Sequence, residues 1–96
     1  TMLMLFIVYH NAVDEEIVEI TKKYAKGYTK FVGVLGEGNK EPQLGTHIWG
    51  GLNNCLLVAL EDNKMKDAIA SDIASLKVKF KDAGVSIFVM PLKEML

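Results

Sequence analysis

Most residues that could do chemistry gather in one stretch, GEGNKEPQLGTHIWGG, at positions 36–51. This stretch holds five of the eight glycines, one of the two histidines and the only tryptophan. The amides around closely spaced glycines such as Gly36 and Gly38 can form a concavity that holds an anion, and Lys40 adds a positive charge. Trp49 offers a flat apolar surface to a ligand or to a neighbouring subunit. The stretch predicts either an anion-binding loop or a plain connection between two strands.

The glycine spacing matches no complete phosphate-binding motif. Gly36 and Gly38 follow an apolar run that is typical of a strand, but no helix pattern follows them. The dinucleotide-binding fingerprint needs that helix, and a P-loop needs a lysine followed by serine or threonine. All eleven basic residues are lysines, so the planar fork with which arginine grips phosphate is missing from the sequence. A phosphate site here would depend on backbone amides and on Lys40.

The two histidines give the candidates for a metal site. His10 ends the first apolar run, and His47 lies in the glycine-rich stretch, where Glu37 adds a carboxylate. The sequence has no HxH, HxxxH or CxxC spacing. These three side chains would have to meet through folding or across a subunit contact. They therefore form an alternative hypothesis.

The residues whose types are typical of catalysis each have a simpler structural role in this sequence. Cys55 lies in the apolar run LNNCLLVAL, where a cysteine is usually a buried thiol of raised pKa. The carboxylates at 14–16 fit the first turn of a helix, and those at 61–62 fit a solvated turn. No serine has a nucleophile-elbow pattern around it. The sequence therefore predicts a protein that is not an enzyme and has no catalytic residues.

The composition indicates one domain, residues 1–96, in which 50% of the residues are hydrophobic. The formal net charge of −1 gives no electrostatic preference for nucleic acid or for an anionic membrane. A single cysteine excludes an intrachain disulfide and suits a reducing compartment. The apolar run at 2–8 lacks the basic flank and the cleavage pattern of a signal peptide. A cytoplasmic protein is expected.

Hydrophobic periodicity predicts four strands and two helices. The first helix is expected to begin with Asn11 as its cap and to stop at Gly27, and the second is expected to have Asn63 as its cap. Gly33 is expected to weaken or bulge its strand, and residues 92–96 are expected to form one short turn. The predicted strands span 2–9, 28–35, 52–60 and 85–90, and the helix stripes are Val13, Ile17, Ile20 and Tyr24, then Met65, Ile69, Ile73, Leu76 and Phe80.

The order strand, helix, strand, strand, helix, strand is a split βαβ repeat. It predicts an α+β, ferredoxin-like βαββαβ sandwich with a four-stranded antiparallel sheet and both helices on one face. The first strand is apolar at successive positions, so the face of the sheet away from the helices is expected to be apolar as well. Such a face needs a cover, and another copy of the chain is the simplest one. The pattern therefore predicts a homo-oligomer.

Two motifs resemble the nitrogen-regulatory PII signalling proteins. The closing run SIFVMPLKEML at 86–96 is similar to that family's K-I-F-V-x-P-V-E-E-V, and VLGEG at 34–38 is similar to its V-x-G-x-G. The THIWGG stretch resembles turns of short PII-like proteins. The resemblance implies a compact homotrimer with inward-facing sheets and an adenine nucleotide bound between subunits. It also implies 2-oxoglutarate sensing with Mg-ATP, and a loop that regulates an enzyme or a membrane transporter.

The chain departs from that family at several phosphate contacts. Asn39 and Lys40 stand where the family has Arg-Gln, and Ser86 stands where it has a phosphate-binding lysine. Gly84 alone keeps the character of the second glycine-rich loop, and the C-terminal arginines are missing. The segment after Gly38 is shorter than the family's signalling loop and has no tyrosine or serine to modify. These differences indicate a short-loop PII-like protein rather than an orthodox nitrogen sensor.

The leading hypothesis is a PII-like regulatory homotrimer that binds a small anionic or nucleotide-type ligand between subunits. The alternatives are a divalent-metal-binding trimer of the CutA type and a purely structural trimer that binds a partner protein. The first hypothesis assigns ligand binding to Gly36, Gly38, Lys40, His47, Trp49 and Gly84. The second assigns the metal to His10, Glu37 and His47.

Overall fold

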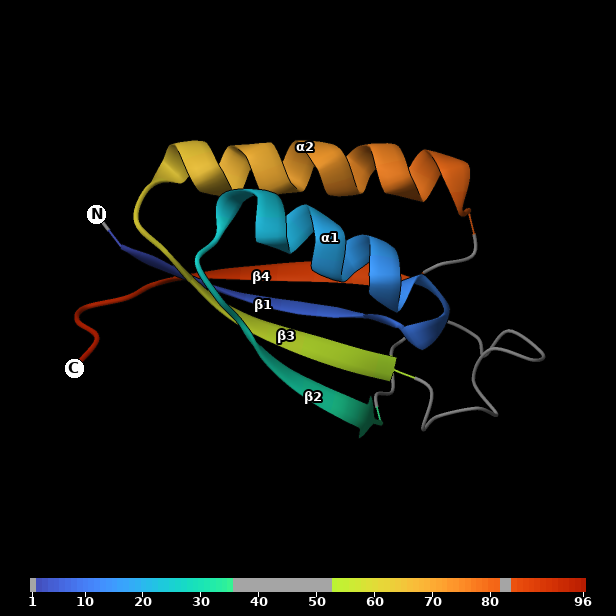
Figure 1. Ribbon diagram of the computed structural model, residues 1–96, viewed down its shortest axis with the longest axis horizontal. Coiled ribbons are helices and arrows are strands. Elements are labelled where there is room, and N and C mark those ends of the chain that lie inside the picture. The colour runs from blue at the N-terminus through green and yellow to red at the C-terminus, as the bar shows by residue number, and fades with distance from the viewer. Residues whose placement is uncertain (1, 36–52, 82–83) are drawn as a thin grey trace.

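The computed structural model describes residues 2–35, 53–81 and 84–96 of the chain. Within these ranges, four strands form one antiparallel sheet in the order β2-β3-β1-β4, and two helices cover the same face of it (Figure 1). The predicted ferredoxin-like βαββαβ fold is therefore confirmed. The elements are β1 Leu3–His10, the short 3-10 helix η1 Asn11–Val13, α1 Asp14–Tyr24, β2 Thr29–Val34, β3 Asn53–Leu60, α2 Asn63–Lys79 and β4 Val85–Pro91.

The core lies between the two helices and the sheet face that they cover. Successive side chains of a strand point to opposite faces, so every second residue of β1 is buried: Leu3, Leu5, Ile7 and Tyr9. The predicted apolar stripes of the helices meet this row and are confirmed. The buried partners are Val13, Ile17, Ile20, Leu56, Val58, Leu60, Ile69, Ile73 and Leu76. None of the helices in the described ranges is long and apolar enough to cross a bilayer.

The other face of the sheet is also apolar, as the sequence predicts. Phe6 lies opposite Leu57 on β3 and opposite Phe88 on β4, and its ring stacks on Phe31 of β2. The centroids of the two rings are 6.4 Å apart and their planes differ by 9°. Phe31 and Phe88 are 43% and 55% exposed, so solvent reaches aromatic surface on this face. We call it the open face.

The ends of the first helix differ from the prediction. Asn11 does not cap α1, because β1 passes into η1, where Nδ1 of His10 accepts a hydrogen bond from the Ala12 amide at 3.1 Å. Val13 stands at the cap of α1 and makes no side-chain cap. The helix ends at Tyr24 rather than at Gly27, because the backbone is already extended one residue after Tyr24.

Two further predictions near element ends are wrong. The cap of α2 is Asp62, not Asn63, because the backbone of Asp62 is extended and its Oδ1 accepts the Met65 amide at 3.0 Å. Residues 92–96 form no turn. Leu92 instead donates its amide to the Met2 carbonyl at 3.0 Å, which keeps the chain beside the start of β1.

The predicted irregularity at Gly33 is confirmed as a bulge. The register between β2 and β3 shifts between Val32 and Val34, and Gly33 has a φ of 69°. A positive φ is costly for any residue with a Cβ. The bulge redirects β2 just before the chain leaves the sheet.

Replacing Gly33 by alanine is expected to lower the free energy of unfolding by about 1–2 kcal/mol, because a Cβ crowds the carbonyl in the left-handed region. Urea unfolding followed by circular dichroism measures this change. Gly27→Ala is the matched control, since a Cβ at Gly27 would meet no atom within 4 Å in the described chain. Equal effects of the two substitutions would contradict the prediction.

Candidate functional site

One end of each of the four described strands lies at the same end of the sheet, which we call the loop end. β1 ends there at His10, β2 ends at Val34, β3 begins at Asn53 and β4 begins at Val85 (Figure 1). The His10 amide donates to the Gly84 carbonyl at 3.2 Å, which ties β1 to the start of β4. The two glycine-containing connections that were predicted to bind a ligand, before β3 and before β4, therefore both join the sheet at the loop end.

Most of the predicted site residues lie outside the described residues. Of the whole predicted set, the structure describes His10 and Gly84, and it brings these two together at the loop end. The sequence assigns them to different hypotheses, the metal and the ligand. The residues outside the described ranges are Gly36, Glu37, Gly38, Lys40, His47 and Trp49.

Gly84 has a backbone that any residue could adopt and open space around it. A Cβ at this position would meet no atom within 4 Å in the described part of the chain. Packing against the described residues therefore does not explain why this position is a glycine. Close approach of a ligand or of another backbone is the other common reason for a glycine.

His10 has one ring nitrogen already in use. Its Nδ1 accepts the Ala12 amide, so a metal bound here would have to use Nε2. Among residues 2–35, 53–81 and 84–96, no three His, Cys, Asp or Glu side chains are placed to hold a metal ion. Glu37 and His47, the other two predicted ligands, lie outside these ranges. The metal hypothesis stays a prediction.

Cys55 is a buried thiol, as predicted. Its side chain lies opposite Val8 on β1 and Phe31 on β2, and the residue is 1% exposed. Burial raises the pKa of the thiol above its ordinary value. A neutral thiol is a poor nucleophile, so the surroundings of Cys55 favour a packing role.

A polar network at the loop end was missed by sequence analysis. Asp14 accepts hydrogen bonds from the Tyr9 hydroxyl at 2.5 Å, from Nζ of Lys30 at 2.7 Å and from Nδ2 of Asn54 at 3.1 Å. The Gly33 amide donates to Oδ1 of Asn54 at 3.3 Å. We call Tyr9, Asp14, Lys30 and Asn54 the Asp14 cluster. It joins the start of α1 to three strands.

The Asp14 cluster holds its carboxylate in the charged form. Desolvation raises the pKa of Asp14, but hydrogen bonds from Lys30, Tyr9 and Asn54 and the charge of Lys30 lower it by more, so the net pKa lies below the ordinary value of an aspartate. Desolvation of Tyr9, with the bond to Asp14 and its charge, raises the pKa of the Tyr9 hydroxyl well above its ordinary value. The Tyr9 proton therefore stays on the phenol and serves as a donor.

Asp14→Asn is expected to lower the free energy of unfolding at pH 7 by about 1–2 kcal/mol, because a charged hydrogen-bond acceptor is lost. The folded pKa of Asp14 is depressed, so its contribution is fully present above the unfolded pKa and is lost as the pH falls through the lower folded pKa. Urea unfolding of both proteins between pH 7 and pH 2 should show the difference shrinking in acid. A difference that stays constant down to pH 2 would refute this assignment.

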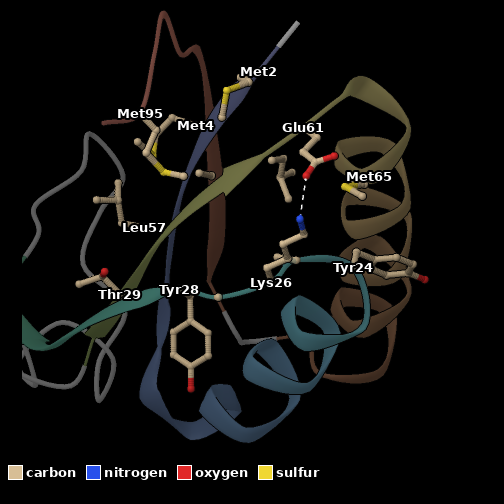
Figure 2. A pocket seen from close by; sticks show the side chains of 14 residues that line it. Met2, Met4, Tyr24, Lys26, Tyr28, Thr29, Leu57, Glu61, Met65 and Met95 are labelled. Atoms are coloured by element: carbon tan, nitrogen blue, oxygen red, sulfur yellow. Dashed lines mark ion pairs between the residues drawn. The ribbon is translucent and has the colours of Figure 1, made fainter.

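A pocket of about 390 Å³ lies at the opposite end of the sheet from the loop end. Figure 2 shows Met2 and Met95 on one side of it and Met65 on the α2 side. Lys26 and Glu61 form an ion pair of 3.1 Å within its lining. The remaining wall is mainly apolar, and sequence analysis missed it because several distant segments contribute. The lining is Met2, Met4, Tyr24, Ala25, Lys26, Gly27, Tyr28, Thr29, Leu57, Ala59, Leu60, Glu61, Met65 and Met95.

The sequence matches no known protein-family model and no curated protein sequence. In contrast, the fold is shared with solved PII-like proteins. CPII from Thiomonas intermedia K12, solved with ADP and bicarbonate bound, has a TM-score of 0.69 and 17% identity over 93% of this chain and 83% of that chain. A PII-like signalling protein from Thermus thermophilus has a TM-score of 0.56 and 22% identity, covering 93% of this chain and 83% of that chain.

A third similar structure is a DUF3240 family protein from Shewanella baltica OS155. Its TM-score is 0.68 at 13% identity, and the match covers 99% of this chain and 93% of that chain. Identities this low establish the fold alone. At that level the resemblance drawn from the sequence motifs is confirmed: the chain has the fold of PII-like signalling proteins.

Proposed function

We propose that the protein is a non-enzymatic PII-like regulatory protein. It would form a homotrimer, bind a small anionic or nucleotide-type ligand between subunits, and change its contact with a partner protein when the ligand binds. The fold of CPII, a protein solved with ADP and bicarbonate, supports this proposal. The partner would be an enzyme or a membrane transporter, as the resemblance to PII proteins implies.

The observation that carries the proposal is the separation of two complementary regions. The loop end brings Gly84 and His10 together, which suits an anion, and the opposite end holds an apolar pocket, which suits a flat aromatic base. β1 has eight residues, so its ends at Leu3 and His10 lie roughly 23 Å apart at 3.3 Å per residue. The pocket wall reaches Leu57, which pairs with Phe6, four residues and roughly 13 Å from His10. A ligand bound between two subunits could use the loop end of one subunit and the pocket of the next.

A cyclic trimer supplies the required geometry. Its interfaces join two different patches of neighbouring subunits, head to tail, and the rotation closes after three copies. The loop end of one subunit can therefore meet the pocket end of the next. The open face, with Phe6, Phe31 and Phe88, gives these subunits an apolar surface to bury.

The charge of the site fits a modest anion affinity. The chain has no arginine, so backbone amides and Lys40 would replace the bidentate contacts that arginine gives to phosphate. A small anion such as bicarbonate needs fewer cationic contacts than a triphosphate does. We therefore expect ADP, AMP or bicarbonate to bind more tightly than ATP.

Calorimetric titration tests the proposal with ATP, ADP, AMP, cyclic dinucleotides and bicarbonate, each with and without 2-oxoglutarate. At least one should bind, and Gly84→Ala should weaken that binding about tenfold, or 1.4 kcal/mol, because a new methyl group would hold the ligand off the backbone. Ser71→Ala, at an exposed position of α2, is the control and should leave the affinity unchanged. Absence of heat and of any thermal shift with every ligand would rule out both the nucleotide and the anion hypotheses.

A further inference from the structure

The bulge near the end of β2 is held by one side-chain contact. Gly33 is held in the left-handed conformation of the bulge, and its amide donates to Oδ1 of Asn54 at 3.3 Å. Asn54 is only 5% exposed, so water gives its amide little alternative bonding. Val34, the last residue of β2, follows directly, and Gly36 comes two positions later in the sequence.

The orientation of the Asn54 amide is in turn set by Asp14. A carboxylate only accepts hydrogen bonds, so the amide must turn its Nδ2 group toward Asp14, where the bond measures 3.1 Å. The amide oxygen then points to the Gly33 backbone, which needs an acceptor. The opposite orientation would place two oxygens against each other and two donors against each other. The charge of Asp14 thus selects the one amide orientation that holds the bulge.

Asp14 is itself fixed by two groups besides Asn54. The Tyr9 hydroxyl, on a residue 1% exposed, donates to Oδ1, and Lys30 pairs with Oδ2 at 2.7 Å. Tyr9 lies on β1 and Lys30 on β2, so the carboxylate is anchored to the sheet from two strands. A hydrogen-bonded chain therefore runs from the start of α1 through Asn54 to the Gly33 bulge.

We infer that Asp14 is a positioning residue: by orienting Asn54 it holds the Gly33 bulge and so sets the direction of the last residues of β2. The relevance of this role to ligand binding rests on the proposed function, but its effect on the Gly33 amide can be measured without any ligand. The charge of Asp14 acts on the bulge through one intervening group, the Asn54 amide.

A second carboxylate offers a matched control. Asp72 accepts hydrogen bonds from the Tyr24 hydroxyl at 2.9 Å and from Nζ of Lys23 at 3.3 Å, so it has the same kinds of partner as Asp14. These bonds join α1 to α2, and within the described chain neither of them reaches Asn54 or β2. Asp72→Asn therefore removes the same charge from a tyrosine–lysine pair without reaching the bulge.

The test compares Asp14→Asn with Asp72→Asn by NMR. In Asp14→Asn the Gly33 amide should exchange with solvent about tenfold faster than in the wild type, because its acceptor is no longer held in place. Asp72→Asn should leave this exchange rate unchanged. Asn54→Leu, which removes both bonds of the amide, should reproduce the Asp14→Asn result.

The outcomes separate this inference from the proposed function. Unchanged Gly33 exchange in Asp14→Asn, or the same change in Asp72→Asn, would overturn the inference. If Asn54→Leu does not fold, the nearly isosteric Asp14→Asn decides alone. If the wild type binds ADP, its affinity should fall severalfold in Asp14→Asn and not in Asp72→Asn. If the wild type binds no ligand, the proposed function fails while faster Gly33 exchange still supports the positioning role.

Discussion

Phe6→Glu is expected to convert the proposed trimer into a monomer of 10.6 kDa and to abolish the proposed ligand binding. Phe6 lies in the middle of the open face, stacked on Phe31 and opposite Leu57 and Phe88. A carboxylate buried among these side chains would cost several kcal/mol without a partner charge. In a cyclic trimer this cost is repeated at each of the interfaces, so the assembly should dissociate fully. Light scattering coupled to gel filtration gives the mass.

A control places the same charge on the opposite side of the molecule. Ser71→Glu changes an exposed position of α2, which lies on the helical layer, and should leave the mass of the assembly unchanged. A wild-type protein that is monomeric at micromolar concentration would contradict the assembly itself. A Phe6→Glu protein that keeps both its trimeric mass and its ligand would contradict the role of the open face.

Ile7→Ala, at the very next position, should act on folding rather than on assembly. Ile7 points to the helices, is fully buried and pairs with Leu56 and Ile87 across the sheet. Removing its side chain should leave a cavity and lower the free energy of unfolding by about 2–5 kcal/mol. A domain of this size is usually stable by about 5–15 kcal/mol, so the melting temperature should fall by more than about 10 °C.

Thermal unfolding followed by circular dichroism at a fixed protein concentration measures this loss. Ile7→Val keeps most of the side chain and should cost about 0.5–1.5 kcal/mol. A loss for Ile7→Ala that is no larger than the loss for Ile7→Val would show that the site collapses around the smaller residue. Together, Phe6 and Ile7 should separate the two faces of β1 into one that holds subunits together and one that holds each subunit folded.

The sequence predicted the fold well because burial on both faces of a strand leaves a direct pattern. The apolar run at 2–9 became β1, and the apolar run at 52–60 became β3, each within one residue of its predicted bounds. The predicted bulge at Gly33 was also found, because glycine inside an apolar strand has few other uses. These features depend on residues that are close together in the sequence, so the sequence alone indicates them.

The helix caps could not be predicted with the same success. Asn11 and Asn63 have suitable side chains, yet His10 and Asp62 accept the amides. A cap needs an extended backbone at one residue and a free amide two or three positions later, and the bounds of the helix decide which residue satisfies both. The element was therefore predictable, but the residue that ends it was not.

The Asp14 cluster and the pocket were missed for a different reason. In the sequence, Asp14 fits an ordinary anion at the start of a helix, and no neighbouring residue indicates that it would bind Lys30 or Asn54. The pairing of β2 with β3 and of β3 with β1 brings these residues together. Strand pairing, here of β1 with β4, also brings His10 close to Gly84. Sites built by strand pairing are visible only once the register is known.

The place of β1 in the sheet also has a consequence for synthesis on the ribosome. β1 is the first of the four described strands, yet it lies between β3 and β4, with Leu3 paired to Leu60 on one side and to Pro91 on the other. Its hydrogen bonds therefore wait for strands made much later, and contacts between such distant residues form slowly. One edge of this apolar strand can pair once β3 has been made, and the other edge stays unpaired until β4 emerges. The segment at 2–9 is therefore open to unwanted strand pairing for most of the synthesis.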